Sequence, residues 1–266
     1  MTSQLRLLLS NSDKKSLIVL RRILKSRSFL RSKTNYSRFP NESFIVSELL
    51  GMGLEIGALS VPFKFSQGVT MDYADVYDSK SARKELDKIP IDKLYFGQIV
   101  DPDFILTKPK YGFDQIEDEK YDFCFSSHSL EHHPNIIYAI AEQLRVVKKS
   151  GKVYGVLPNK EKTYDCNRKL TPSAILIDRY VNSIFSIPEE NVRDLVFNTF
   201  NHPYYQDKSE NRLKFVLKNP SGMHHYFVYS PTTVLELLMW ASVKLRFSLE
   251  YFYLENENIH FLLRKQ

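Results

Sequence analysis

Apolar and polar positions along the chain form blocks that predict strands alternating with helices from about residue 51 onward. Five short apolar runs have the length of buried strands: residues 54–56, 69–71, 98–106, 121–126 and 152–157. The third run is interrupted by Pro102. Residues 79–88 form a predicted polar helix, and residues 135–147 a helix with one apolar side. Strands that alternate with helices in this way predict a parallel, doubly wound α/β sheet.

The alternating pattern is lost between residues 159 and 228. This region is rich in Asn, Tyr, Phe and Arg, and its helical stretches, 173–186 and 189–200, are weaker than those before it. Because it interrupts the pattern just after the fifth predicted strand, we expect it to be an insertion that covers the crevice of the sheet as a lid.

The end of the chain predicts a helix followed by a closing β-hairpin. Residues 231–243 have helical spacing, and residues 246–253 and 258–264 read as two β segments joined by the polar turn 255–257. A terminal hairpin after five strands is unusual in nicotinamide-binding folds. We expect the α/β domain to span residues 46–266.

Composition narrows the class of protein. Hydrophobic residues make up 43% and charged residues 26% of the 266 positions, which predicts a globular chain. No apolar run approaches the roughly 20 residues of a membrane span. With only two cysteines, Cys124 and Cys166, structural disulfides are not expected, and a reducing cytoplasm fits best.

The net charge of +6 is concentrated near the N-terminus. Residues 1–40 hold ten Lys or Arg against one acid, a charge of +9, which leaves −3 for the other residues. The body is therefore not a basic surface for nucleic acid. Residues 1–45 are interpreted as a basic arm, with a helix over 4–31 and a linker over 32–41.

The basic arm has three interpretations. It could lie on an anionic membrane, at the inner face, where each Lys or Arg contributes about 1 kcal/mol. It could hold a polyanionic or lipid-linked substrate, or contact a partner such as a glycosyltransferase. It could also be solvated helices packed on the body or on a second subunit of an oligomer.

Small or polar residues follow three of the predicted strands. Gly57 follows the first strand, Asp72 the second, and Ser126 to His128 the fourth. In an open α/β sheet the carboxyl ends of the strands line the ligand crevice, so these positions predict a nucleotide-like cofactor site. Asp75 lies nearby, but Asp72 directly follows the apolar run. The alternatives are an ordinary strand-to-helix turn at Gly57 and a helix cap at Asp72.

Three segments resemble motifs of the class I S-adenosylmethionine-dependent methyltransferases: Glu55-Ile56-Gly57-Ala58-Leu59-Ser60, Tyr121 to His132, and Leu144 to Gly151. The resemblance implies a Rossmann-like, mostly parallel seven-stranded sheet with an antiparallel last strand. It also implies S-adenosyl-L-methionine as the cofactor. The usual second and third glycines of the first motif are missing, since Ala58 and Ser60 occupy that region.

Eight residues are the cofactor-binding candidates implied by this resemblance: Glu55, Gly57, Ala58, Asp72, Asp103, Ser126, Ser127 and His128. Gly57 would allow close approach of the backbone to the cofactor. A carboxylate at Asp72 would accept hydrogen bonds from both ribose hydroxyls.

The segment from Pro158 to Thr171 resembles a subfamily associated with bacterial surface polysaccharides, such as O-antigen and capsule. Lys160, Thr163, Asp165 and Arg168 keep the pattern of that subfamily. The likeness implies a glycan or nucleotide-sugar substrate, with Thr163, Tyr164 and Arg168 as its ligands. Asp165 and Arg168 could equally form a structural ion pair that fixes the loop.

Methyl transfer to a hydroxyl needs a base, and histidine is suited to that role. The candidates are His128, His132 and His225, with Asp165 as a further catalytic residue. A buried structural histidine is the alternative at His225. Around Glu131 the histidines do not follow the order of zinc peptidases, so no metal is expected.

The predicted function is O-methylation of a sugar in a bacterial surface glycan or its precursor. The alternative is a catalytically silent methyltransferase-like module that binds ligand for a partner enzyme. A nicotinamide-dependent oxidoreductase is disfavoured by the absence of Gly-x-Gly-x-x-Gly.

Overall fold

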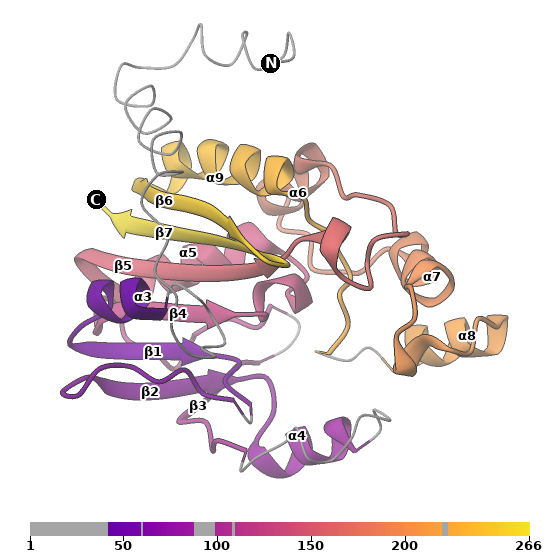
Figure 1. The fold of residues 1–266 in the computed structure, drawn as a ribbon, viewed down its shortest axis with the longest axis horizontal. Coiled ribbons are helices and arrows are strands. Elements are labelled where there is room, and N and C mark those ends of the chain that lie inside the picture. The colour runs from indigo at the N-terminus through magenta and orange to yellow at the C-terminus, as the bar shows by residue number, and fades with distance from the viewer. Residues whose placement is uncertain (1–41, 60, 88–98, 108–109, 220–222) are drawn as a thin grey trace, which may run out of the picture.

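The computed structural model describes residues 42–59, 61–87, 99–107, 110–219 and 223–266. The predicted N-terminal helix and linker lie outside these residues. One seven-stranded sheet forms the centre of the described chain (Figure 1). Its strands, from one edge to the other, are β3 (Phe104–Ile105), β2 (Thr70–Asp75), β1 (Met52–Ile56), β4 (Tyr121–Ser127), β5 (Val147–Pro158), β7 (Asn258–Lys265) and β6 (Phe247–Glu255).

The pairing confirms the predicted fold class. Strands β3, β2, β1, β4 and β5 pair in parallel, while β7 is antiparallel to both β5 and β6. Parallel strands β1 and β4 end side by side, because Ile56 is in register with Ser126. The carboxyl ends of the parallel strands therefore share one edge of the molecule.

Two strand boundaries differ from the prediction. The turn expected over residues 148–151 lies inside β5, where the register to β4 shifts between Tyr121 and Phe123 and Ser150 has φ 63°. A bulge at that point lets β5 continue. The third strand is reduced to β3, which starts just after Pro102, a residue that cannot donate to a ladder.

One face of the sheet is covered by α5 (Ile136–Val146), α6 (Ser173–Val181) and α9 (Pro231–Leu245), which bury their apolar sides in the main core. Helix α5 begins at Asn135, whose side chain accepts a hydrogen bond from the backbone N–H of Tyr138 at 3.1 Å. Ile137 and Ile140 are completely buried on its inner side. This helix supports β4 and β5 directly below the polar edge.

The opposite face carries a second apolar cluster under α3 (Glu42–Glu48), a helix that the sequence pattern did not predict. Ile45 packs there with Phe125. The segment after β1 adds Phe63, whose ring centroid lies 4.8 Å from that of Phe125. Helix α3 crosses the predicted boundary at residue 45 and packs with the sheet.

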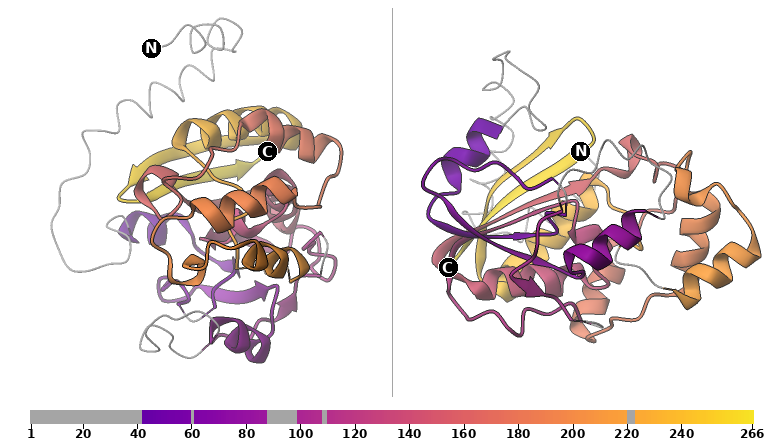
Figure 2. Two further views of the ribbon diagram at one scale, coloured as in Figure 1. Left: turned by 90° about the vertical axis from the view of Figure 1, so that its right-hand side faces the viewer. Right: turned by 90° about the horizontal axis from the view of Figure 1, so that it is seen from below.

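The insertion lies beyond the carboxyl ends of the strands, and α4 (Ser79–Leu86) lies at the same edge (Figures 1 and 2). Besides α6, the insertion contains α7 (Glu189–Asn198), α8 (Glu210–Lys218) and the short turns η4 (Lys160–Lys162) and η5 (Pro203–Tyr205). A third turn, η3 (Leu130–His132), follows β4. Among the helices that the structure describes, none has the length and apolar character needed to cross a bilayer.

Candidate functional site

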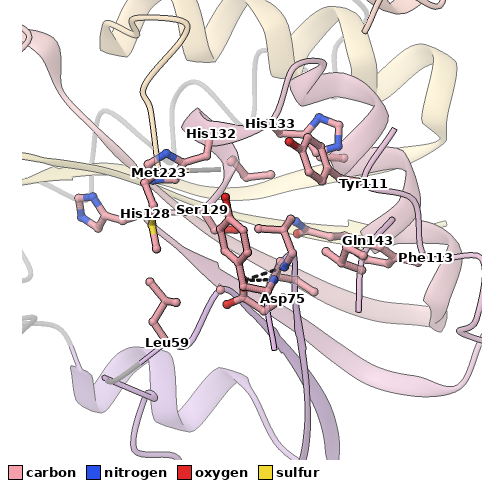
Figure 3. A pocket seen from close by; sticks show the side chains of 17 residues that line it. Leu59, Asp75, Tyr111, Phe113, His128, Ser129, His132, His133, Gln143 and Met223 are labelled. Carbon is pink, nitrogen blue, oxygen red and sulfur yellow. Dashed lines mark hydrogen bonds between the residues drawn. The ribbon is translucent and has the colours of Figure 1, made fainter. Parts of the chain in front are cut away.

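A cavity opens where β1, β2 and β4 end (Figure 3). Gly57 follows β1, Asp75 ends β2, and His128 follows β4, and all three line this first cavity. Its volume is about 80 Å³. The position is the crevice predicted from the strand ends.

Two features of the structure disfavour a side chain at position 57. The φ of Gly57 is +73°, in the left-handed region, and an added Cβ would come within 3.1 Å of the Ser129 side chain. Its N–H donates to the carbonyl of Ala74 at 2.9 Å, which ties the end of β1 to β2. The left-handed turn at Gly57 therefore forms part of the cavity wall without a side chain of its own.

The carboxylate at the end of β2 is Asp75, and the placement of Asp72 at that end was wrong. Asp72 lies within β2, in register with Leu54, and its side chain accepts hydrogen bonds from Lys120 at 2.8 Å and Tyr121 at 2.7 Å. The strand continues beyond it because β2 is only partly buried, and its pattern lacks a continuous apolar run. Asp75, rather than Asp72, lines the cavity (Figure 3).

The Asp75 carboxylate is partly buried and accepts hydrogen bonds from the backbone. Burial raises the pKa of its carboxyl to about 6, although the backbone N–H groups of Tyr77 and Val76 donate to it and oppose that rise. Such a group is partly protonated near pH 6. A ligand that donates hydrogen bonds would favour its ionised form.

Other cofactor candidates support the crevice rather than line it. Glu55 is buried, and its carboxylate accepts the backbone N–H of Phe63 at 3.1 Å, so it holds the segment after β1. Asp103 lies just before β3 and accepts the N–H of Tyr73 at 2.8 Å. Ala58 is buried beside Gly57.

The two serines that end β4 differ in their contacts. The Ser126 hydroxyl donates to Gln143 at 3.4 Å. The Ser127 hydroxyl is buried, and it has no hydrogen-bond partner among the described residues. Both positions lie at the predicted edge, while the first cavity is lined by the residues that follow them.

A second, larger cavity of about 1000 Å³ adjoins the first. Residues of the insertion form most of its wall, and the substrate candidates Thr163 and Tyr164 are among them. Three residues line both cavities: His128, His132 and Met223. Figure 3 shows these three side chains close together at one end of the first cavity. Two ligands could therefore meet at this junction.

His128 adopts a backbone conformation that is unfavourable for a residue with a side chain. Its φ is +51°, and its N–H donates to the carbonyl of Val156 at 3.1 Å. Its ring Nε2 lies 2.9 Å from Oδ1 of Asn258, the first residue of β7. Strained residues of this kind cluster at active sites.

His225 belongs to a buried ionic network. Its Nδ1 lies 2.7 Å from Asp165, and Asp165 accepts a hydrogen bond from Arg168 at 2.8 Å. Burial opposes ionisation of Asp165, but His225 and Arg168 together hold the pKa of its carboxyl below the usual value. Since the carboxylate can only accept, the Nδ1 of His225 carries the hydrogen and Nε2 accepts from the Tyr164 hydroxyl at 2.8 Å.

Arg168 fixes the loop instead of facing the second cavity. Its side chain is fully buried and also contacts Asp194 of α7 at 3.1 Å and the carbonyl of His225 at 2.6 Å. Asp165 and Arg168 therefore form the structural ion pair that the sequence left open as an alternative to substrate binding. Asp165 reaches the site only through His225.

Glu131 was not among the predicted site residues. It is completely buried in η3, and its Oε1 lies 3.4 Å from Nδ1 of His128 and 3.7 Å from Nε2 of His225. Burial opposes its ionisation, yet the contact with His128 and the charges of His132 and His225 lower its pKa. Burial also lowers the pKa of His132 to about 4. The spacing of His128 and Glu131 was the available sequence signal, since residues three apart meet across a helical turn.

Comparisons with known proteins show similarity in fold. No family model matches it, and no curated protein sequence does. A candidate Zn-dependent alcohol dehydrogenase from Rhodobacter sphaeroides is 14% identical, with 86% of this chain and 90% of that chain covered and a TM-score of 0.50.

Two methyltransferases are similar at lower scores. A SAM-dependent methyltransferase from Aquifex aeolicus is 13% identical, with 85% of this chain and 89% of that chain covered and a TM-score of 0.44. A candidate S-adenosyl-L-methionine-dependent methyltransferase from Methanococcus maripaludis is 19% identical, with 85% and 83% covered and a TM-score of 0.39. At these identities the likeness concerns the fold.

Proposed function

We propose that this protein transfers the methyl group of S-adenosyl-L-methionine to a hydroxyl oxygen of a sugar. The observation that carries the proposal is the junction of two cavities at His128, His132 and Met223. The first cavity has the features of a nucleoside site, namely the close backbone turn at Gly57 and the carboxylate of Asp75. The second has room for an acceptor.

The residues of the first cavity fit the cofactor in two respects. Gly57 lines the first cavity with a turn that carries no side chain, so a ligand can approach the backbone there. The Asp75 carboxylate can accept hydrogen bonds from a ribose diol. When bound there, S-adenosyl-L-methionine supplies a methyl group activated by its sulfonium charge.

His128 is the residue that we assign as general base. Its Nε2 lies 2.9 Å from Asn258 Oδ1 and its Nδ1 lies 3.4 Å from Glu131 Oε1, so an acceptor faces each ring nitrogen and would stabilise the ring once it has taken a proton. The acceptor hydroxyl gives its proton to His128 while its oxygen forms the new bond to carbon and the carbon–sulfur bond breaks. A base placed in this way contributes about 10²–10⁴-fold in rate.

The walls of the second cavity support a sugar acceptor. Tyr164, Phe200 and Tyr204 supply aromatic faces, and Asn201 and Lys162 supply polar groups. Aromatic faces beside hydrogen-bonding groups suit the apolar faces and hydroxyls of a sugar ring. The assignment to a bacterial surface glycan rests on the resemblance over residues 158–171.

Two measurements on the full chain test the proposal. Calorimetry with S-adenosyl-L-homocysteine should show one binding site. Radiolabelled methyl transfer to a panel of nucleotide sugars and glycans should label a carbohydrate. The variant His128→Ala should lose about 10²–10⁴-fold in kcat and keep its affinity for S-adenosyl-L-homocysteine.

Each outcome has a distinct meaning. Absence of cofactor binding would contradict the enzymatic assignment. Binding without any labelled product would instead support a silent binding module that serves a partner enzyme. Label on protein or small phenols, but on no carbohydrate, would contradict the sugar acceptor alone.

A further inference from the structure

We propose that Glu131, His132 and His225 bind a divalent transition-metal cation at the junction of the two cavities. These three side chains each offer one ligand atom, and the three atoms lie within 4.8 Å of one another. They come from two distant parts of the chain, since Glu131 and His132 belong to η3 and His225 to the end of the insertion. Two imidazoles and one carboxylate form a ligand set typical of zinc sites that keep a position open for a substrate.

The strongest support is the state of Glu131. Neither carboxylate oxygen accepts a hydrogen bond from any residue that the structure describes, although the side chain is completely buried. A buried carboxylate is costly unless it is paired or coordinates a metal. Its nearest nitrogens belong to His128 and His225, at 3.4 and 3.7 Å, beyond hydrogen-bond distance for His225. Glu131 therefore lacks a full counter-charge.

The buried guanidinium of this network is paired with other carboxylates. Arg168 is shared between Asp165 and Asp194, and neither of these ion pairs involves Glu131. A divalent cation between Glu131 and the two histidines would balance the excess of negative charge.

The two histidines present the nitrogens that a metal requires. Nδ1 of His132 is buried without a hydrogen-bond partner in the described chain. Nδ1 of His225 is bound to Asp165, and its Nε2 lies toward Glu131, where a cation would displace the hydrogen bond from the Tyr164 hydroxyl. A carboxylate that orients a histidine in this manner is a common support for metal ligands.

The cation would assist the proposed methyl transfer, and this role rests on the proposed function, whereas the site itself does not. Because His132 lines both cavities, a cation held by the three side chains would lie beside the junction that an acceptor in the second cavity approaches. A bound cation lowers the pKa of the hydroxyl, whose proton then passes to His128. No electron transfer is involved.

The direct test is metal binding by the full chain after treatment with a chelator. Calorimetric titration with Zn²⁺ should show one site, and Co²⁺ should give visible absorption bands of a low-symmetry site. Glu131→Gln and His225→Gln should each weaken Zn²⁺ binding by at least about tenfold, and Asp165→Asn by about 10- to 100-fold.

A matched control uses a histidine of the same cavity outside the cluster. His202→Gln should leave the Zn²⁺ affinity within about threefold, because His202 lines the second cavity but is not one of the three ligands. Equal loss in His202→Gln and His225→Gln would indicate nonspecific imidazole binding and overturn the proposal. Circular dichroism establishes that each variant is folded.

A measurement on the unaltered chain covers the case in which the buried Glu131→Gln variant fails to fold. X-ray absorption of the Zn²⁺-loaded protein should show two imidazole ligands. A shell without them, or no stoichiometric binding of Zn²⁺ or Co²⁺, would overturn the site. Titration of the same metal-free protein with S-adenosyl-L-homocysteine tests the proposed function separately, since cofactor binding and metal binding can each fail alone.

Discussion

At the residue scale, Gly57 combines a left-handed backbone with a crowded neighbour, and the two effects can be separated. Gly57→Ala should lower the free energy of unfolding by about 1–2 kcal/mol from the backbone alone. It should also weaken S-adenosyl-L-homocysteine binding at least about tenfold, since the methyl group would come within 3.1 Å of Ser129. Urea unfolding and calorimetry measure the two effects.

Gly68 provides the control for that substitution. It has a φ of +93°, but an added Cβ would meet no atom within 4 Å, and Gly68 does not line the first cavity. Gly68→Ala should therefore lose stability without losing ligand affinity. Equal affinities of the two alanine variants would contradict the assignment of Gly57 to the binding site.

Asp75 should give ligand binding a pH dependence. Burial raises its pKa to about 6, and a carboxylate accepts from a diol best when it is ionised. Affinity for S-adenosyl-L-homocysteine should therefore fall by up to about tenfold per pH unit below pH 6. Asp75→Asn should bind weakly and with a flat profile between pH 5 and 8, whereas Asp72→Asn should keep the profile of the natural chain. Calorimetry across this range decides between the two carboxylates.

The same group should affect stability with the opposite sign. Its folded pKa, about 6, lies above the value of 3.8 for a free carboxyl. The contribution of Asp75 to stability is then fully present below about pH 4 and is lost as pH rises through about 6. As pH rises over this interval, denaturation of the ligand-free chain should show the free energy of unfolding of Asp75→Asn increasing relative to that of the natural chain. A constant difference would contradict the raised pKa.

At the element scale, α3 and the residues just after it pack on the sheet through one side, while the other side faces solvent. Leu49 is completely buried just after α3, while its neighbour Leu50 is 58% exposed. Leu49→Ala should lower the free energy of unfolding by about 2–5 kcal/mol, because it leaves a cavity against the sheet. Leu50→Ala should change it by less than about 0.5 kcal/mol. Urea unfolding measures both, and similar losses would contradict the packing of α3.

The elements that the sequence predicted well are those with an unambiguous period. Strand β4 contains a run of buried residues from Phe123 to Ser126, and α5 has an asparagine cap and repeated buried isoleucines. By contrast, α3 was missed because its buried Ile45 follows a polar stretch that resembles a linker. Helix α8 was missed because only Leu213 and Val216 mark its inner side among charged residues.

The site was predicted where it depends on strand ends and missed where it depends on contacts across the fold. His128 and Gly57 follow from local patterns, since each comes directly after an apolar run. The approach of Glu131 to His225 depends on how the insertion folds back, which no local pattern encodes. Asp75 was missed because the partly buried pattern of β2 did not mark its end.

At the scale of the whole molecule, the buried Arg168 joins the loop after β5 to α7 and to the backbone at His225. Arg168→Met would leave Asp165 and Asp194 without their cation. The free energy of unfolding should fall by about 3–5 kcal/mol. Protease cleavage within the insertion should increase, because its attachment to the sheet is weakened.

Arg193 is the matched control, because it pairs with Glu210 between α7 and α8 at the surface. Its side chain is 48% exposed, so Arg193→Met should change the free energy of unfolding far less than Arg168→Met does. Urea unfolding and limited proteolysis compare the two variants. Equal losses would show that the insertion is not held by the Arg168 network.

Because His128 has a left-handed backbone, directed evolution for thermal stability and directed evolution for activity would favour different residues at this position. Glycine at this position would relieve about 1–2 kcal/mol of strain and would remove the proposed proton acceptor. A library selected only for thermal stability would accumulate this replacement and yield stable variants without catalytic activity. Campaigns to improve the catalyst therefore need both criteria in every round.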